Sequence, residues 1–374
     1  MLNNDSGFLF LHAIDKRRVN FVWVSKKFLF LIIQKKLFMK KYVLGVFFGW
    51  IVSSLQAQDI HFSQFGAAPI ILNPALTGLS NCTYRATLNY RNQWASIAGP
   101  SSYQTYAASF DIGLFRESLN YSMLGLGLMV FNDVSADGAL NNLTMMASMA
   151  YHQNLGGKGN HYLSLGGQAG LVQKSVDVDK LVFESMIGDN GVDPTLFSGE
   201  YFDPNTSYFD INVGANIRSR FGNHFAIQLG GAYHHLAEPA ESFYNSVDNK
   251  INARYTAYAS LKAGWDKFVI IPSGIYMLQT EESNKEITVG GTLGFRLEEG
   301  VSFLYLGGHY RLDDAIIPSL GIDYNNIQFG ISYDVTNSEL GAINNNRGGL
   351  ELSLIFTGCL THEDKFTIDC PRFM

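Results

Sequence analysis

The chain has 374 residues and a net charge of −6, with 47% hydrophobic residues but only 16% Asp, Glu, Lys and Arg. Its mean hydropathy is close to zero. Transmembrane helices would raise that index, and an ordinary soluble domain would carry more charge, about a quarter of its residues. No cluster of Lys and Arg follows residue 45, so we expect no nucleic-acid partner. The composition suits a β-barrel with one lipid-facing and one polar side to each strand.

Residues 39–57 have the organisation of a secretory signal peptide. A basic start, Met39-Lys40-Lys41, precedes the apolar stretch from Tyr42 to Ser53. The small residue Ala57 then predicts cleavage before Gln58. The junction lacks a Cys, so we expect no lipoprotein anchor.

Residues 1–38 precede this complete signal. A start codon assigned too early explains them, and an extended n-region or a helical anchor is the alternative. Their apolar run, Phe28–Ile33, is far shorter than the roughly 20 residues that a membrane-spanning helix needs.

From Tyr84 to Phe356 the sequence repeats one pattern: about fourteen runs of roughly ten residues alternate apolar and polar and end at Gly-, Asn- or Asp-rich breaks. Successive side chains of a strand point to opposite faces, and about nine to eleven residues let a tilted strand cross a bilayer. The predicted strands lie near 84–94, 103–113, 121–131, 142–153, 161–175, 208–218, 224–236, 254–264, 268–279, 286–296, 301–311, 315–323, 326–335 and 349–356.

Loop lengths support the same fold. Outer-membrane barrels have short periplasmic turns and longer outer loops. The three longest connections, 176–207, 237–253 and 336–348, all fall on one side of the predicted barrel. A soluble β-sandwich or β-propeller favours shorter strands and would not sort loops this way. We therefore predict an all-β outer-membrane barrel over 84–356, with a periplasmic leader or plug at 58–83 and a periplasmic C-terminal tail at 357–374.

A search for catalytic chemistry is negative. The histidines His161, His224, His234 and His235 lack metal-site spacing, and the usual nucleophile, zinc and phosphate-binding motifs are missing. Paired glycines inside the strand patterns favour barrel curvature rather than a nucleotide site; they are Gly166-Gly167, Gly230-Gly231, Gly290-Gly291 and Gly307-Gly308. We expect no enzyme, cofactor or metal.

The alternative interpretation is a calcium site in the longest, acidic loop. Its oxygen-bearing side chains suit calcium, although their spacing is not that of an EF-hand; they are Asp177, Asp179, Asp189, Asn190 and Asp193. A solvated acidic loop is the simpler interpretation.

Closure of the barrel would bring the cysteines together. Cys82 precedes the first strand, whereas Cys359 and Cys370 follow the last, and the first and last strands meet at the seam. The periplasm permits disulfides. Cys359 with Cys370, or Cys82 with either, are all compatible with the sequence, and at least one thiol is left over.

Several short motifs occur in a fixed order along the chain. The first are Asp59–Phe65, containing Phe62-Ser63-Gln64, and Asn73–Gly78, containing Asn73-Pro74-Ala75. The later ones are Tyr90–Trp94, Lys174–Phe183, Ser332–Val335, Gly348–Leu354 and the ending Cys370-Pro371-Arg372-Phe373. In this order they resemble the PorP/SprF family of type IX secretion system membrane proteins. The region of Asp193-Pro194 and Asp203-Pro204 departs from the family pattern.

The resemblance implies a non-enzymatic protein of the Gram-negative outer membrane in Bacteroidetes that assists export or surface anchoring of large adhesins, including gliding-motility adhesins. Implied partners are periplasmic and outer-membrane components of the secretion machinery, the C-terminal domain of a secreted adhesin, and the lipid bilayer. Candidate partner-binding residues come from the matched motifs: Phe62, Ser63, Gln64, Asn73, Pro74, Ala75, Gly78, Cys370, Pro371, Arg372 and Phe373. The alternative function is a barrel transporter for small or hydrophobic solutes.

Overall fold

A computed structural model describes residues 60–360, except 117, 157–158, 189–190, 194, 197–198, 200, 223, 245–248, 280–283 and 299–301. The expected cleavage site at Ala57 and Gln58 lies outside the described residues, as do Cys370, Pro371, Arg372 and Phe373. Among the described residues, no helix is both long and apolar enough to span a membrane.

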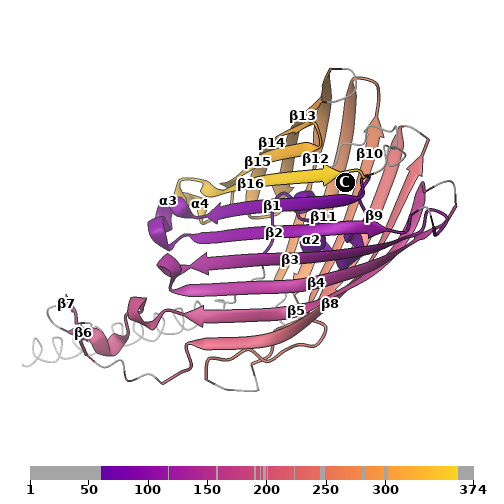
Figure 1. Ribbon diagram of the computed structural model, residues 1–374. Helices are drawn as coiled ribbons and strands as arrows, with labels where there is room; N and C mark the ends of the chain where they lie inside the picture. The colour runs from indigo at the N-terminus through magenta and orange to yellow at the C-terminus, as the bar shows by residue number, and fades with distance from the viewer. Residues whose placement is uncertain are drawn as a thin grey trace, which may run out of the picture. The chain divides into compact units, whose positions relative to one another are not determined.

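Fourteen antiparallel strands close into a barrel in the order β1-β16-β15-β14-β13-β12-β11-β10-β9-β8-β5-β4-β3-β2 (Figure 1). Their bounds are β1 Tyr84–Gln93, β2 Tyr103–Leu114, β3 Met123–Ser135, β4 Leu140–Asn154, β5 His161–Val176, β8 Asn205–Phe221, β9 Phe225–His234, β10 Arg254–Gly264, β11 Phe268–Gln279, β12 Asn284–Glu298, β13 Ser302–Arg311, β14 Ala315–Tyr324, β15 Ile327–Thr336 and β16 Arg347–Gly358. The predicted fold class is confirmed.

Closure at the seam pairs β1 with β16 along ten residues, from Tyr84 with Gly358 to Gln93 with Gly349. The alternation of the sequence becomes the two faces of the wall. On β8 the side chains of Phe209, Val213 and Ile217 are exposed on the outside, where an apolar surface is what lipid requires. Asp210 and Asn212, between them in sequence, are buried in the interior.

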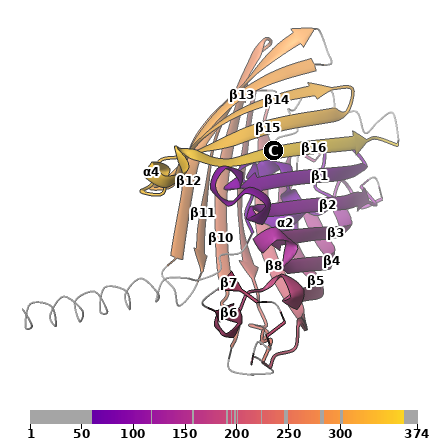
Figure 2. The ribbon, with the colours of Figure 1, turned by 90° about the vertical axis from the view of Figure 1, so that its left-hand side faces the viewer.

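The connections divide between two rims. The short-turn rim is where β2 connects to β3, β4 to β5, β8 to β9, β10 to β11, β12 to β13 and β14 to β15. The long-loop rim carries the longest connections, 177–204, 235–253 and 337–346. Figure 2 looks onto the long-loop rim, where α3, α4 and the two-stranded β6–β7 sheet lie.

Short helices interrupt the connections and the leader. The α-helices are α2 Pro69–Leu72, α3 Ala95–Ala98 and α4 Gly341–Asn344. The 3-10 helices are η1 Phe65–Ala67, η2 Pro74–Leu76, η3 Gly99–Ser101, η4 Ala136–Gly138, η5 Val178–Lys180 and η6 Glu184–Met186. The small sheet consists of β6 Ile187–Gly188 and β7 Gly191–Val192.

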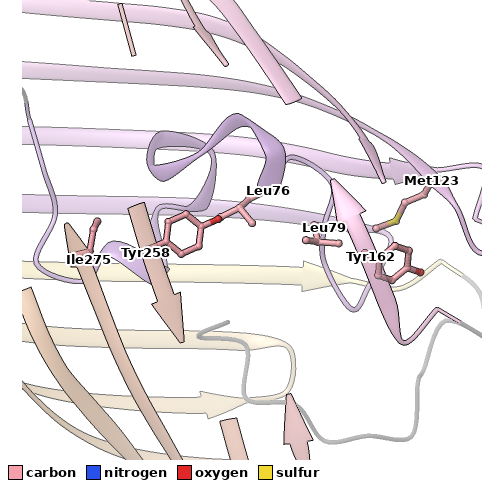
Figure 3. Close-up of a cluster of buried hydrophobic side chains, with 6 residues drawn as sticks. All are labelled: Leu76, Leu79, Met123, Tyr162, Tyr258 and Ile275. Atoms are coloured by element: carbon pink, nitrogen blue, oxygen red, sulfur yellow. The ribbon is translucent and has the colours of Figure 1, made fainter. Parts of the chain in front are cut away.

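The described part of the leader, residues 60–83, lies inside the barrel. It contains η1, α2 and η2, and α2 is visible within the ring of strands in Figure 1. Leader side chains take part in the hydrophobic clusters of the interior. In Figure 3, Leu76 and Leu79 lie beside Tyr258 and Ile275 on one side and Met123 and Tyr162 on the other. The core of the molecule is therefore the contact between leader and wall.

Candidate functional site

The start of the leader is bound to β1, β13, β15 and β16 by a group of polar side chains that we call the latch: Ser63, Gln64, Arg91, Arg311, Asp334 and Glu351. The Glu351 carboxylate accepts hydrogen bonds from the backbone N–H groups of Ser63 and Gln64, at 2.7 and 2.8 Å. The Ser63 hydroxyl donates to Asp334 at 2.8 Å. Two consecutive amides on one carboxyl group fix the leader's backbone, because each N–H of this buried stretch has its own acceptor oxygen.

Two buried arginines complete the latch. Arg91 from β1 and Arg311 from β13 contact Asp334 Oδ2 at 3.2 and 3.0 Å. Arg311 also donates to the Ser63 hydroxyl at 2.8 Å, and Arg91 donates to the His61 carbonyl. The Asp334 and Arg311 side chains are only 7% and 3% exposed, so each charge depends on its partners for the solvation it has lost.

The middle of the leader begins with an asparagine that holds three parts of the barrel. The Asn73 side chain donates to the carbonyls of Ala215 and Gly231, at 3.0 and 3.1 Å, and to the Tyr258 hydroxyl at 3.2 Å. Its Oδ1 accepts from the Ala75 N–H at 2.8 Å and so caps η2. Pro74 occupies the first helical position, where its missing N–H costs nothing. The Asn-Pro-Ala motif is thus a capped turn joined to the wall.

The same segment lies against inward-facing glycines of β3, β5 and β8, which we call the glycine wall: Gly125, Gly127, Gly166 and Gly214. A methyl group on Gly166 would lie 2.5 Å from the carbonyl carbon of Pro74. One on Gly125 would lie 1.9 Å from the Thr77 carbonyl oxygen. Glycine is the residue that lets a backbone or side chain approach a strand this closely.

Closer to the short-turn rim, the leader is bound by polar residues of β1, β2 and β4. The Thr77 and Ser148 hydroxyls lie 2.5 Å apart, and the Gly78 N–H donates to Asp111 at 2.6 Å. Asp111 also receives the Arg85 guanidinium at 2.7 Å. The leader therefore leaves the lumen along a wall whose charged groups bind its backbone.

The exit is closed covalently. Cys82, just before β1, forms a disulfide with Cys359, just after β16. Arg116 donates to the Ser80 carbonyl at 2.9 Å, and Arg218 donates to the Asn81 side chain at 2.9 Å. The end of the leader is fixed at the seam and at the short-turn rim.

On the other side of the leader is a cavity of about 100 Å³. Leader residues Phe65, Leu72 and Leu76 form its apolar side. Strands β10 to β15 supply small hydroxyl side chains: Ser260, Ser273, Thr292, Ser319 and Ser332. Ser273 is hydrogen-bonded to His309 at 3.0 Å. We call these strands the cavity wall.

The sequence-predicted residues divide into two groups. The leader residues Phe62, Ser63, Gln64, Asn73, Pro74, Ala75 and Gly78 lie inside the barrel and contact its wall or the cavity. Cys370, Pro371, Arg372 and Phe373 lie outside the described residues, so Cys82–Cys359 is the pairing that the described part of the chain contains.

Residues considered for metal have other surroundings. His235 pairs with Asp210 at 2.9 Å, and the His224 ring lies 2.8 Å from the Gly264 carbonyl. Within the described part of the chain, which omits Asp189 and Asn190, no three His, Cys, Asp or Glu side chains are grouped to hold a metal ion.

Sequence reasoning did not find the wall residues that contact the leader. Glu351, Asp334 and Arg311 each occupy an inward position of a strand, where the alternating pattern indicates polarity without indicating a partner. The paired-glycine pattern explains Gly166 by curvature, but this glycine is also a contact site for the leader. A signal for that contact is present in the sequence: Gly166 falls on the inward face beside the buried Ser164 and Gln168, whereas Gly167 does not.

An antiparallel barrel with an apolar outer face, and with its own N-terminal segment in a polar interior, is an outer-membrane protein. The family model described as type IX secretion system membrane protein PorP/SprF matches residues 54–356. The chain belongs to this family.

Solved structures similar to the chain are also barrels. The CymD monoaromatic hydrocarbon channel is 13% identical, with a TM-score of 0.45 over 80% of this chain and 94% of that chain. The Pseudomonas putida toluene transporter TodX is 9% identical, with a TM-score of 0.47 over 80% of this chain and 95% of its own. No curated protein matches the sequence.

Proposed function

We propose that this protein is a non-enzymatic outer-membrane subunit of the type IX secretion system that assists export or surface anchoring of large adhesins. Membership of the family supports the secretion system as its setting. The observation that carries the proposal is the leader, which occupies the lumen and is bound by buried charges and a disulfide. A barrel filled in this way suits an anchoring or docking subunit better than a freely open pore.

The two rims suit different partners. We place the short-turn rim in the periplasm, because short turns face that side in outer-membrane barrels. Components of the machinery would meet it there, together with the C-terminal tail and its Cys370–Phe373 ending. The adhesin C-terminal domain would meet the long-loop rim at 176–207, 237–253 and 336–348.

Deletion of the gene tests this function. We expect one large adhesin to disappear from the cell surface while uptake of small solutes stays normal. Complementation with the wild-type chain restores the adhesin. Normal surface adhesin in the deletion strain, with small-solute uptake impaired, would contradict the proposal.

The second candidate, a transporter for small or hydrophobic solutes, is favoured by the cavity between the leader and the cavity wall. Its apolar and hydroxyl-bearing sides suit a small neutral solute. In liposomes containing the purified protein, solute permeability above that of protein-free liposomes would support transport. Permeability equal to the protein-free control would leave the secretion role as the function.

A further inference from the structure

The described leader begins at the long-loop rim. The Ile60 carbonyl accepts a hydrogen bond at 3.2 Å from Arg254, the first residue of β10, which starts at that rim. The His61 ring lies 3.1 Å from Glu286, near the start of β12. The His61 carbonyl is bound by Arg91, near the end of β1 at the same rim. Contacts with three strands from different parts of the wall thus place the first described residues at the long-loop rim.

The leader ends at the opposite rim. Ser80 is bound by Arg116 from the turn after β2, and Cys82 is joined to Cys359 after the end of β16. The Thr83 hydroxyl accepts a hydrogen bond from the Leu360 N–H at 3.0 Å. All of these partners belong to the short-turn rim.

Between the rims, the contacts follow the order of the sequence. Asn73 reaches Ala215 and Gly231, which are inside β8 and β9, and Thr77 reaches Ser148 inside β4. Gly78 then reaches Asp111, three residues before the end of β2. These contacts approach the short-turn rim steadily as the residue number rises. In a leader that entered and left the lumen at one rim, the contacts would first move away from that rim and then return to it.

We propose that the leader is threaded through the barrel, so that the chain enters the lumen on the long-loop side and leaves it on the short-turn side. Ile60 and His61, which are only partly buried, then lie at the same rim as the long loops. A polypeptide that docks on those loops meets the entrance of the leader as well. On the proposed function, that polypeptide is the secreted adhesin.

Threading also restricts the machinery's contacts on the short-turn side. There the leader presents Ser80–Thr83, whereas its Phe62–Gln64 and Asn73–Gly78 motifs are occupied by the wall. A periplasmic component therefore contacts the end of the leader and the residues after Gly358. The two leader motifs bind the barrel wall from inside and are not available to a periplasmic partner.

Epitope accessibility in intact cells tests the threading. One epitope is inserted between Gln58 and Asp59, a second between Asp189 and Asn190 in the longest loop, and a third between Gly156 and Gly157 in a short turn. Antibody binding is compared before and after permeabilisation of the outer membrane. We expect the first two epitopes to be bound on intact cells and the third only after permeabilisation.

The outcomes separate threading from orientation. If the Gln58 and Asp189 epitopes are both bound only after permeabilisation and the Gly156 epitope on intact cells, threading stands and the proposed orientation falls. If the Gln58 epitope shares its side with the Gly156 epitope, threading is overturned.

Single cysteines provide the same test without insertions, in a chain whose three native cysteines are Ser. Ile60→Cys is compared with Val192→Cys at the long-loop rim and Leu155→Cys at the short-turn rim, using a membrane-impermeant maleimide on intact cells. We expect Ile60→Cys to follow Val192→Cys. If Val192→Cys is labelled on intact cells while Ile60→Cys and Leu155→Cys both stay unlabelled, the proposal is overturned.

Discussion

The interior of the barrel has two unlike sides, although both arise from the same alternation of residues. On β3, β5 and β8 glycines at four inward positions let the leader approach the strands closely, and at Gly125 and Gly166 backbone lies against backbone. On β10 to β14 inward positions carry hydroxyl and aromatic side chains, and a cavity lies between part of this side and the leader, which touches it at points such as Tyr258 and Arg311. Polarity alone does not distinguish the two sides. The size of the inward side chains decides where the leader lies.

The largest effect is expected at the latch. Asp334→Ala removes the carboxylate that Arg91 and Arg311 share, and loss of one partner of a buried ion pair costs about 3–5 kcal/mol. We expect a matching fall in the free energy of unfolding in urea and faster chymotrypsin cleavage at Phe62 and Phe65. Asp314→Ala is the matched control, since it removes a half-exposed carboxylate from the same Arg311 and costs about 1 kcal/mol or less. Equal effects of the two substitutions would contradict the role of the latch.

The disulfide ranks next. Cys359→Ser frees the end of the leader from the closing strand, and loss of a cross-link across a long loop lowers stability by about 2–4 kcal/mol. Urea unfolding of the oxidised proteins measures this loss. Cys370→Ser, which keeps the Cys82–Cys359 bond, is the control. If both variants unfold at the wild-type urea concentration, the bond does not stabilise the barrel.

In the glycine wall, a position that faces the leader can be compared with the adjacent position of the same strand, which does not face it. Gly166→Ala places a methyl group 2.5 Å from Pro74, whereas the methyl group of Gly167→Ala is 3.8 Å from its nearest neighbour. Overpacking typically costs about 1–3 kcal/mol. We expect Gly166→Ala, and not Gly167→Ala, to lower stability and to expose the leader to chymotrypsin. Similar behaviour of the two variants would show that the leader does not lie on this wall.

The smallest effect is expected on the cavity wall. Ser273→Ala removes one hydrogen bond to His309 and leaves the edge-on contact of the His309 ring with Phe65 in place, so the loss is about 0.5–1.5 kcal/mol. Protection of Phe62 and Phe65 from chymotrypsin should equal that of the wild type. Increased cleavage there would mean that the two sides of the interior are not independent.

The sequence predicted the wall better than its contents, for a physical reason. The period of two and the turn-forming breaks are local signals, so β2, β5 and β11 begin at the predicted residues 103, 161 and 268. β8 is longer than predicted, Asn205–Phe221 rather than 208–218, because its ends extend beyond the apolar stretch. The leader has no such period. Its position depends on contacts hundreds of residues away, such as Ser63 with Glu351, which no local pattern contains.

The central claim is that the leader lies on the glycine-bearing side of the lumen, and one cross-linking measurement tests it most directly. In a chain whose native cysteines are Ser, Thr77→Cys is combined with Ser148→Cys, because the native hydroxyls are 2.5 Å apart. The wall pair Thr87→Cys with Ser109→Cys, whose hydroxyls are 2.6 Å apart, is the positive control. Thr77→Cys with Ser273→Cys, on the cavity wall, is the negative control.

After mild oxidation of intact cells, proteolytic fragments on a non-reducing gel report each cross-link. We predict a bond between residues 77 and 148 as complete as that of the wall pair, and none between 77 and 273. A 77–273 bond, or no 77–148 bond while the wall pair forms, would contradict the placement of the leader.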